Sequence, residues 1–222
     1  MTQAPDVAQE LHSALERAVA FEAALWACFE GEDPPPLRAT GRTELSLAAL
    51  LLSREHAAIL KEALANDAPS TAAALFRLQF EALLRAAWIQ YSATDSHLST
   101  LTQSIDEESE KQASRLPGVK DMLKSIVGSA PHGLVEPLVS LHGGIAGPLN
   151  SYVHTGLHPI RRRLMGFPND LIWLLLTQSN RLVHHAYRLM AALYVSQPVM
   201  DRVVAVGHQF NDCVGYTQDT ST

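Results

Sequence analysis

The stretch from Ser70 to Asp95 constrains the fold more than any other part of the chain. On a helix of about 100° per residue, its charged residues fall on one narrow stripe, and the other directions are dominated by alanine, leucine, phenylalanine and isoleucine. A helix that is apolar on nearly every side is usually buried in a core. We therefore expect a buried central helix over 70–95. Its stripe consists of Arg77, Glu81, Leu84, Arg85 and Trp88.

The charges on this stripe need partners, because a buried charge is costly unless it is paired and hydrogen-bonded. Arg77, Glu81 and Arg85 follow one another at i,i+4, which places each arginine beside the glutamate. Two interpretations stay open, a structural ion-pair network and the wall of a polar pocket. In the pocket interpretation the two guanidinium groups hold a phosphate or carboxylate, and Glu81 orients them or acts as a base.

The rest of the chain is patterned for helices as well. Hydrophobic residues recur at three- and four-residue steps in several further stretches, and no convincing run of alternating β-branched residues occurs. Three consecutive prolines predict an extended connector over 30–42, and a loose tail is expected over 215–222. The prediction is an all-α, single-domain bundle of about six to eight helices over 1–222, packed around the 70–95 helix. The other expected helices span 6–29, 43–66, 95–114, 119–127, 134–152, 169–195 and 199–214.

Composition excludes several classes of protein. The chain has 222 residues, 47% of them hydrophobic, and a net charge of −6, which does not suit a dedicated nucleic-acid binder with a global basic field. Cys28 and Cys213 are the only cysteines, so neither a disulfide framework nor a zinc site is expected, and a reducing cytoplasm fits. The apolar run at 171–176 is far shorter than the roughly 20 residues of a membrane span. We expect no cofactor, no metal and no membrane partner.

A second polar group follows the predicted 134–152 helix. Asn150 and His154 share a helical face, and Ser151 lies close to them at i,i+3. His154 and His158 have the i,i+4 spacing of a metal pair, but a glycine and a proline break the helix there and no acidic third ligand accompanies them. Two alternatives remain for His154, a hydrogen-bonded histidine of the core and a site residue facing Arg77 or Glu81.

The run Arg161 to Arg163 adds a local basic cluster to this segment. It is expected to be exposed, paired with the acidic patch at 106–110, or in contact with phosphate. Arg161 and Arg162 are the phosphate-binding candidates within it.

Three runs of sequence resemble a known family. LLLSREHAAIL, FRLQFEALLRAAWIQYSATD and LNSYVHTGLHPIRRR together look like an uncharacterised bacterial all-helical family, a domain of unknown function, over about residues 43–213. This resemblance implies a helical fold and brings no established activity with it.

The order of an Arg-x3-Glu helix and a later Ser-x2-His helix is also similar to HEPN-like helical proteins. That resemblance implies a bundle, dimerisation and, in some members, metal-independent RNA cleavage. The family's catalytic motif is an arginine, four to six residues and then a histidine. Arg202 and His208 have this spacing, although Val203 stands where the family usually has a polar residue.

Two functional hypotheses follow. The first is a HEPN-like protein that binds RNA or a nucleotide and, in its catalytic form, is a metal-independent ribonuclease, with His154 as acid or base beside Arg77 and Glu81. The second is a non-catalytic helical interaction module, a homodimer or a partner in a bacterial toxin or defence system, in which the stripe only fixes packing. The ligand-binding candidates of the first hypothesis are Arg85, Asn150, Ser151, His158, Arg161 and Arg162.

Overall fold

The computed structural model describes residues 7–32, 41–104, 106, 107, 111, 114 and 116–215, with the side chains of 144–147 left out. Within these residues there are ten helices and no strand, so the predicted all-α fold is confirmed. Six of the helices are longer than ten residues. In chain order the ten helices are α1 (Val7–Ala27), α2 (Arg42–Ala65), α3 (Pro69–Tyr91), α4 (Asp95–Thr102), α6 (Val119–Ile126), α7 (His132–Val153), α8 (Leu157–Met165), α9 (Asn169–Tyr194), α10 (Gln197–Gln209) and α11 (Asn211–Val214).

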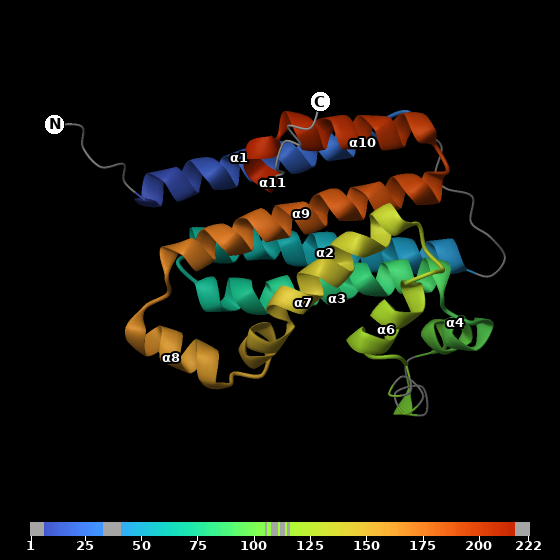
Figure 1. Cartoon of the computed structure of the whole chain (residues 1–222), viewed down its shortest axis with the longest axis horizontal. Helices are drawn as coiled ribbons and strands as arrows, with labels where there is room; N and C mark the ends of the chain where they lie inside the picture. The colour runs from blue at the N-terminus through green and yellow to red at the C-terminus, as the bar shows by residue number, and fades with distance from the viewer. Residues whose placement is uncertain are drawn as a thin grey trace.

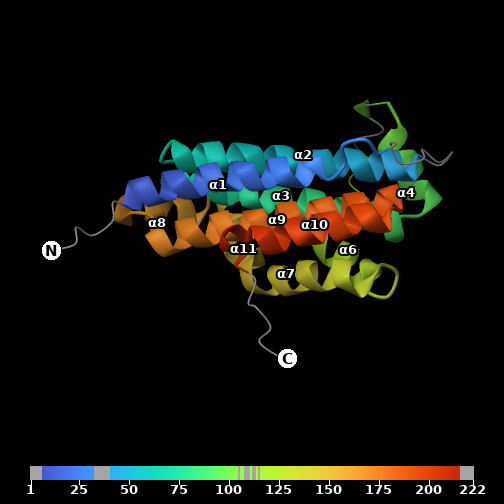
Figure 2. The same ribbon diagram turned by 90° about the horizontal axis from the view of Figure 1, so that it is seen from above.

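The helices form an elongated bundle. In Figure 1, α1 and α10 run along one side, and α4, α6 and α8 lie on the opposite side. In the perpendicular view, α2 lies at one edge and α6 and α7 at the other, with α3 and α9 between them (Figure 2). Both views place α8 at one end of the long axis and α4 at the other.

The central helix predicted from the sequence is α3. It packs along α2 and also contacts α6, α7 and α9, so that apolar residues on most of its sides are buried. Two members of the predicted stripe, Leu84 and Trp88, are among these buried residues. The part of the stripe that is not buried is therefore smaller than the sequence suggested, and it consists of Arg77, Glu81 and Arg85.

The end of the central helix was predicted four residues too late. The helix stops at Tyr91, and a new helix, α4, begins at Asp95. A capping box explains the break, because the side chain of Thr94 accepts from the backbone N–H of His97 and Nδ1 of His97 accepts from the N–H of Thr94.

Three predicted segments lie partly or wholly outside the described residues. Positions 33–40 of the proline-rich connector, 216–222 of the tail, and 108–110 of the acidic patch lie outside them. Within the described part of that patch, Glu107 pairs with Lys111 rather than with the arginine run. The predicted 134–152 helix runs unbroken as α7 through Pro137 and Pro148.

Candidate functional site

The charged stripe of α3 contains one ion pair. Nε of Arg77 lies 2.6 Å from Oε1 of Glu81, while Nε and Nη1 of Arg77 are buried without a hydrogen bond of proper geometry. The neighbouring helix α7 presents His142 to this region. Burial lowers the pKa of His142, and the charges of Arg77 and Lys120 lower it further. The stripe therefore faces the middle of α7.

Arg85 is not part of this pair. Its Nη1 donates to the backbone oxygen of Pro117 at 3.5 Å, and its guanidinium lies 5.6 Å from the ring centroid of Trp88. Burial lowers the pKa of Arg85, and the charge of Glu81 opposes the shift. The side chain of Arg85 thus connects α3 to the backbone at Pro117.

His154 does not meet the stripe. It is exposed at the carboxyl end of α7, and its side chain makes no hydrogen bond or ion pair within the described part of the chain. His142, which is next to Arg77, lies twelve residues earlier, a separation of roughly 18 Å along a helix. The structure therefore brings Arg77 and Glu81 together and leaves His154 apart from them.

Ser151 shapes the turn from α7 to α8. Its hydroxyl accepts from the backbone N–H of His158 at 3.1 Å, and its carbonyl accepts from the N–H of Gly156 at 2.7 Å. A Cβ added at Gly156 would lie 2.7 Å from Oγ of Ser151, so a larger residue here would displace the Ser151 hydroxyl. Asn150 is exposed one residue earlier. These two polar residues thus end a helix rather than line a catalytic pocket.

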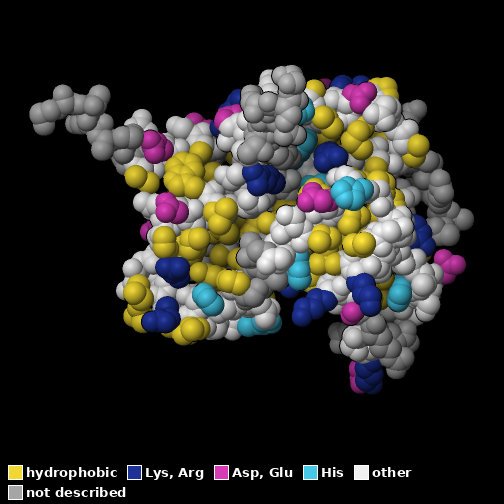
Figure 3. All heavy atoms as spheres, in the orientation of Figure 1, with side chains coloured by type: hydrophobic (Ala, Val, Ile, Leu, Met, Phe, Trp, Pro, Cys, Tyr) yellow, Lys and Arg dark blue, Asp and Glu magenta, His cyan; other side chains and the backbone are white. Residues whose placement is uncertain are grey.

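Helix α8 has its apolar side turned to solvent. Leu157, Ile160 and Leu164 follow one another at i,i+3 and i+7 and are 63%, 54% and 82% exposed, and no residue of α8 is buried. Arg161 and Met165 are exposed as well. We call these five side chains the α8 surface. In Figure 3, hydrophobic and basic side chains occupy the corner of the molecule where α8 lies.

The other side of α8 covers a cavity of about 320 Å³ between α3, α7 and α9. Two predicted ligand-binding residues, His158 and Arg162, lie at this cavity, and with Arg161 they also line a smaller hollow of about 260 Å³. None of Arg77, Glu81 and Arg85 lines either space. The remaining lining of the larger cavity is mainly apolar: Ala73, Phe76, Pro148, Leu149, Tyr152, Phe167, Leu171, Leu174, Leu175 and Gln178.

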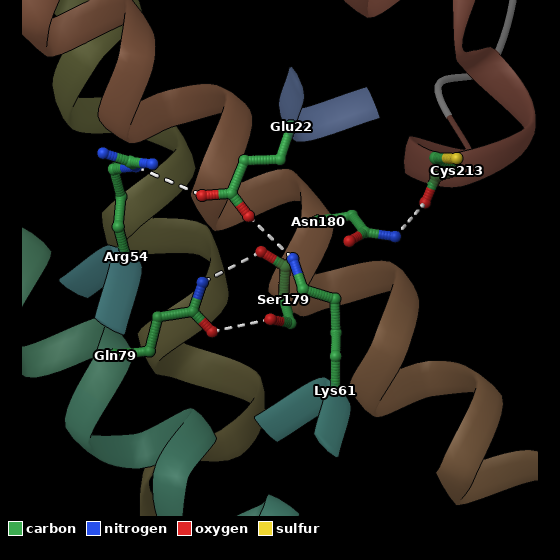
Figure 4. Close-up of polar contacts among 7 residues, drawn as sticks. All are labelled: Glu22, Arg54, Lys61, Gln79, Ser179, Asn180 and Cys213. Atoms are coloured by element: carbon green, nitrogen blue, oxygen red, sulfur yellow. Dashed lines mark hydrogen bonds and ion pairs between the residues drawn. The ribbon is translucent and has the colours of Figure 1, made fainter. Parts of the chain in front are cut away.

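A complete ion-pair network lies elsewhere, inside the bundle. Glu22 of α1 receives Arg54 at 3.1 Å and Lys61 at 2.8 Å, both from α2 (Figure 4). All three side chains are largely buried, and the guanidinium of Arg54 also lies 4.6 Å from the ring centroid of Trp26. The two cations satisfy both carboxylate oxygens, so this network holds α1 against α2.

Several buried amide and hydroxyl groups are also paired with one another. Gln79 of α3 donates to the carbonyl of Ser179 in α9 at 2.9 Å and accepts from its hydroxyl at 2.8 Å (Figure 4). The hydroxyl of Ser53 donates to the carbonyl of Gln79, and Asn180 donates to the carbonyl of Cys213. Polar groups that are satisfied by one another leave nothing to bind a ligand.

The pair with HEPN-like spacing does not converge. Arg202 donates to the carbonyl of Cys28 at 2.8 Å and pairs with Glu32 at 2.5 Å. His208 lies near His184 instead, because six residues on a helix turn it about 240° away from Arg202. The two side chains thus interact with different residues.

Neither the α8 surface nor the Glu22 network was predicted from the sequence. The apolar spacing at 157, 160 and 164 is visible in the sequence, but a pattern of this kind does not say whether its apolar side faces the core. The sequence around Glu22 does not indicate its ion pairs, because its partners are 32 and 39 residues away.

These elements define an all-α helical-bundle protein with a solvent-facing helix at one end. The chain belongs to a family of unknown function, DUF6988, whose model matches residues 50–215. The resemblance to a helical family of unknown function is thereby confirmed, and the resemblance to HEPN-like proteins is not confirmed by this match. No curated protein and no solved structure matches significantly.

Two further findings apply to the described residues. None of the helices there has the length and apolarity that crossing a membrane requires. No group of three or more histidine, cysteine, aspartate or glutamate side chains is arranged to hold a metal ion within the same residues.

Proposed function

We propose that the protein is a non-catalytic helical interaction module that pairs with a second copy of itself through the α8 surface. The observation that carries the proposal is the outward orientation of Leu157, Ile160 and Leu164. Contiguous apolar side chains exposed beside basic ones are typical of interaction sites, and anchors at i, i+3 and i+7 are the spacing with which helices dock.

The shape of the α8 surface supports a second copy as the partner. A two-fold contact needs a projection and a matching recess on the same surface, because each copy must offer both. Leu164 and Met165 project from α8, and the hollow of about 260 Å³ on the same surface is lined by Leu157, Arg161 and Met165 together with His158 and Arg162. In the pair, the apolar side chains of each α8 cover the recess of the other copy.

Charge supports the same arrangement. Arg161 is exposed, and α8 contains no acidic residue. Asp170 is exposed in the first turn of α9, and neither side chain forms an ion pair within the described residues. In a two-fold pair Arg161 of one copy lies near Asp170 of the other, which offsets the repulsion between the two arginine runs.

The ribonuclease hypothesis lacks a comparable observation. It places His154 as acid or base beside Arg77 and Glu81, and His154 is apart from them. The histidine near Arg77 is His142, which that hypothesis does not use. The exposed apolar helix has no role in that hypothesis, whereas the interaction module explains it.

Sedimentation equilibrium of the purified chain tests the proposal. Wild type should be dimeric at micromolar concentrations, and Leu164→Glu should be monomeric, because a carboxylate would enter the apolar centre of the contact. The matched control is Ile59→Glu, which places the same charge at a half-exposed apolar position on α2. A monomeric wild type, or equal dissociation by both substitutions, contradicts the proposal.

A further inference from the structure

A groove beside α9 has a chemistry that neither the bundle interior nor the α8 surface explains. It lies between α7, α9 and α10 and has a volume of about 950 Å³. In Figure 1, α7 and α10 flank α9 along this part of the molecule. The volume is at the upper end of the range for small-molecule sites, which is roughly 300–1,000 Å³. Its polar lining is Glu136, Ser140, Gln178, Arg181, His184, His185, Arg188 and His208.

Arg188 is the residue of the groove that indicates a ligand. Its Nε is buried without a hydrogen-bond partner, and its guanidinium forms no ion pair within the described residues. Arg181, in the same groove, differs because it donates to the carbonyls of Val214 and Gly215. Buried cationic donors are rarely left unsatisfied in native proteins. Arg188 is thus a half-buried cation that faces a cavity and lacks an anion.

Arg77 also has buried nitrogen atoms without hydrogen bonds, but its situation is different. It has a carboxylate, that of Glu81, at 2.6 Å, and it does not line the groove. Of these two arginines, only Arg188 combines a missing anion with an adjoining space large enough for a ligand.

The two buried histidines of the groove add no positive charge at neutral pH. Nε2 of His184 donates to the carbonyl of Val203 at 3.0 Å, and Nε2 of His185 donates to that of Leu134 at 2.6 Å. Burial is the main cause that lowers the pKa of each to about 4, and the charge of Arg188 contributes to the same shift. The groove therefore attracts an anion through arginine.

We infer that this groove binds a small phosphorylated molecule of nucleotide size, with its phosphate on Arg188. A planar guanidinium presents parallel donors that match phosphate oxygens, and Ser140 and Gln178 supply further polar contacts. Glu136 is an exposed carboxylate at the same groove, suited to hydroxyl or amino groups of the ligand. It also repels a continuous phosphate backbone, which favours a small ligand over RNA.

Isothermal titration of the full chain with inorganic phosphate, adenosine monophosphate and adenosine tests this inference. Both phosphate-bearing probes should bind and adenosine should not. Arg188→Gln should weaken the binding of adenosine monophosphate by at least about tenfold, the loss expected for a charge-assisted hydrogen-bond pair. The matched control is Arg163→Gln, which removes an exposed arginine outside the groove and should leave affinity unchanged.

A second variant separates ligand binding from folding. Ser140→Trp fills the groove from the exposed side of α7 and leaves Arg188 in place, so it should also abolish binding while the far-ultraviolet circular dichroism stays that of wild type. Failure of wild type to bind either phosphate probe overturns the inference. So do equal affinities of wild type and both groove variants, equal binding of adenosine, or binding of RNA oligonucleotides alone. The result is independent of self-association, because Leu164→Glu should bind adenosine monophosphate like wild type.

Discussion

The bundle interior and the α8 end differ in whether their atypical side chains have partners within the chain. Inside the bundle, polar side chains such as Glu22 and Gln79 are buried, and each is satisfied by residues from another helix. At the α8 end, apolar side chains such as Leu164 are exposed, and none of the residues that the structure describes covers them. A buried polar group with partners is a feature of the scaffold. A contiguous set of exposed apolar side chains is typical of a surface that another molecule covers.

This difference predicts that substitutions in the two regions change different properties. Interior substitutions should lower the free energy of unfolding and leave self-association of the folded fraction intact. Substitutions on α8 should do the reverse.

The largest expected effect is on the Glu22 network. Glu22→Gln leaves Arg54 and Lys61 largely buried without a counter-charge, and loss of one partner of a buried pair costs about 3 to 5 kcal/mol. Urea denaturation followed by circular dichroism measures the change. Glu62→Gln, at an exposed position of the neighbouring helix, is the control and should shift stability by less than about 0.5 kcal/mol. Similar losses in both variants would show that the network is not a stabilising scaffold.

The buried histidines predict a dependence of stability on pH. The pKa values of His184 and His185 fall from the ordinary 6.5 to about 4 on folding, so the unfolded chain takes up protons first as the pH drops. Stability is therefore full above about pH 6.5 and declines toward pH 4, by up to roughly 3 kcal/mol per histidine.

Urea denaturation between pH 7 and pH 4.5 measures this decline. His185→Gln keeps a donor for the carbonyl of Leu134 and removes one titrating group, so its stability should fall less steeply than that of wild type. Parallel curves for the two proteins would mean that His185 titrates normally in the folded state.

A smaller effect is expected where α10 crosses α9. A Cβ added at Gly207 would overlap Cε1 of His184 and lie 2.6 Å from its Nε2. Gly207→Ala should therefore destabilise the protein by about 1 to 3 kcal/mol through overpacking. Gly143→Ala, whose added Cβ meets nothing within 4 Å, should be neutral or stabilising by up to about 1 kcal/mol. Thermal melting of the two variants compares them, and equal melting temperatures would contradict the close packing at Gly207.

The smallest effect on stability is expected at the α8 surface. Leu164 is 82% exposed, so Leu164→Glu should change the free energy of unfolding of the isolated chain by less than about 0.5 kcal/mol. Urea denaturation of dilute protein measures this. A loss of several kcal/mol would place Leu164 in the core of its own chain and remove the contrast with Glu22.

The sequence predicted the scaffold better than the site. The composition of the 70–95 stretch identified the buried central helix, because a helix that is apolar on nearly every side has few other places to lie. Its end at Tyr91 was missed, since the capping box of Thr94 and His97 uses a histidine that capping patterns do not anticipate.

The positions of the candidate site residues depended on long-range geometry. Arg77 and Glu81 pair because both lie on one helix, where spacing alone brings them together. His154 is on another helix, and its height along α7 relative to α3 is set by packing that no local pattern reports. The basic residues of α8 were recognised, but the outward direction of its apolar side required the structure.

Cross-linking at the α8 surface tests most directly whether this surface is where two copies meet. Met165→Cys places a thiol there, and Ile59→Cys places one at an exposed position on α2, while the native cysteines Cys28 and Cys213 are buried. With a short bismaleimide, Met165→Cys should form a covalent dimer and Ile59→Cys should stay monomeric. Absence of the dimer, or equal dimer in both variants, would show that two copies do not meet at the α8 surface.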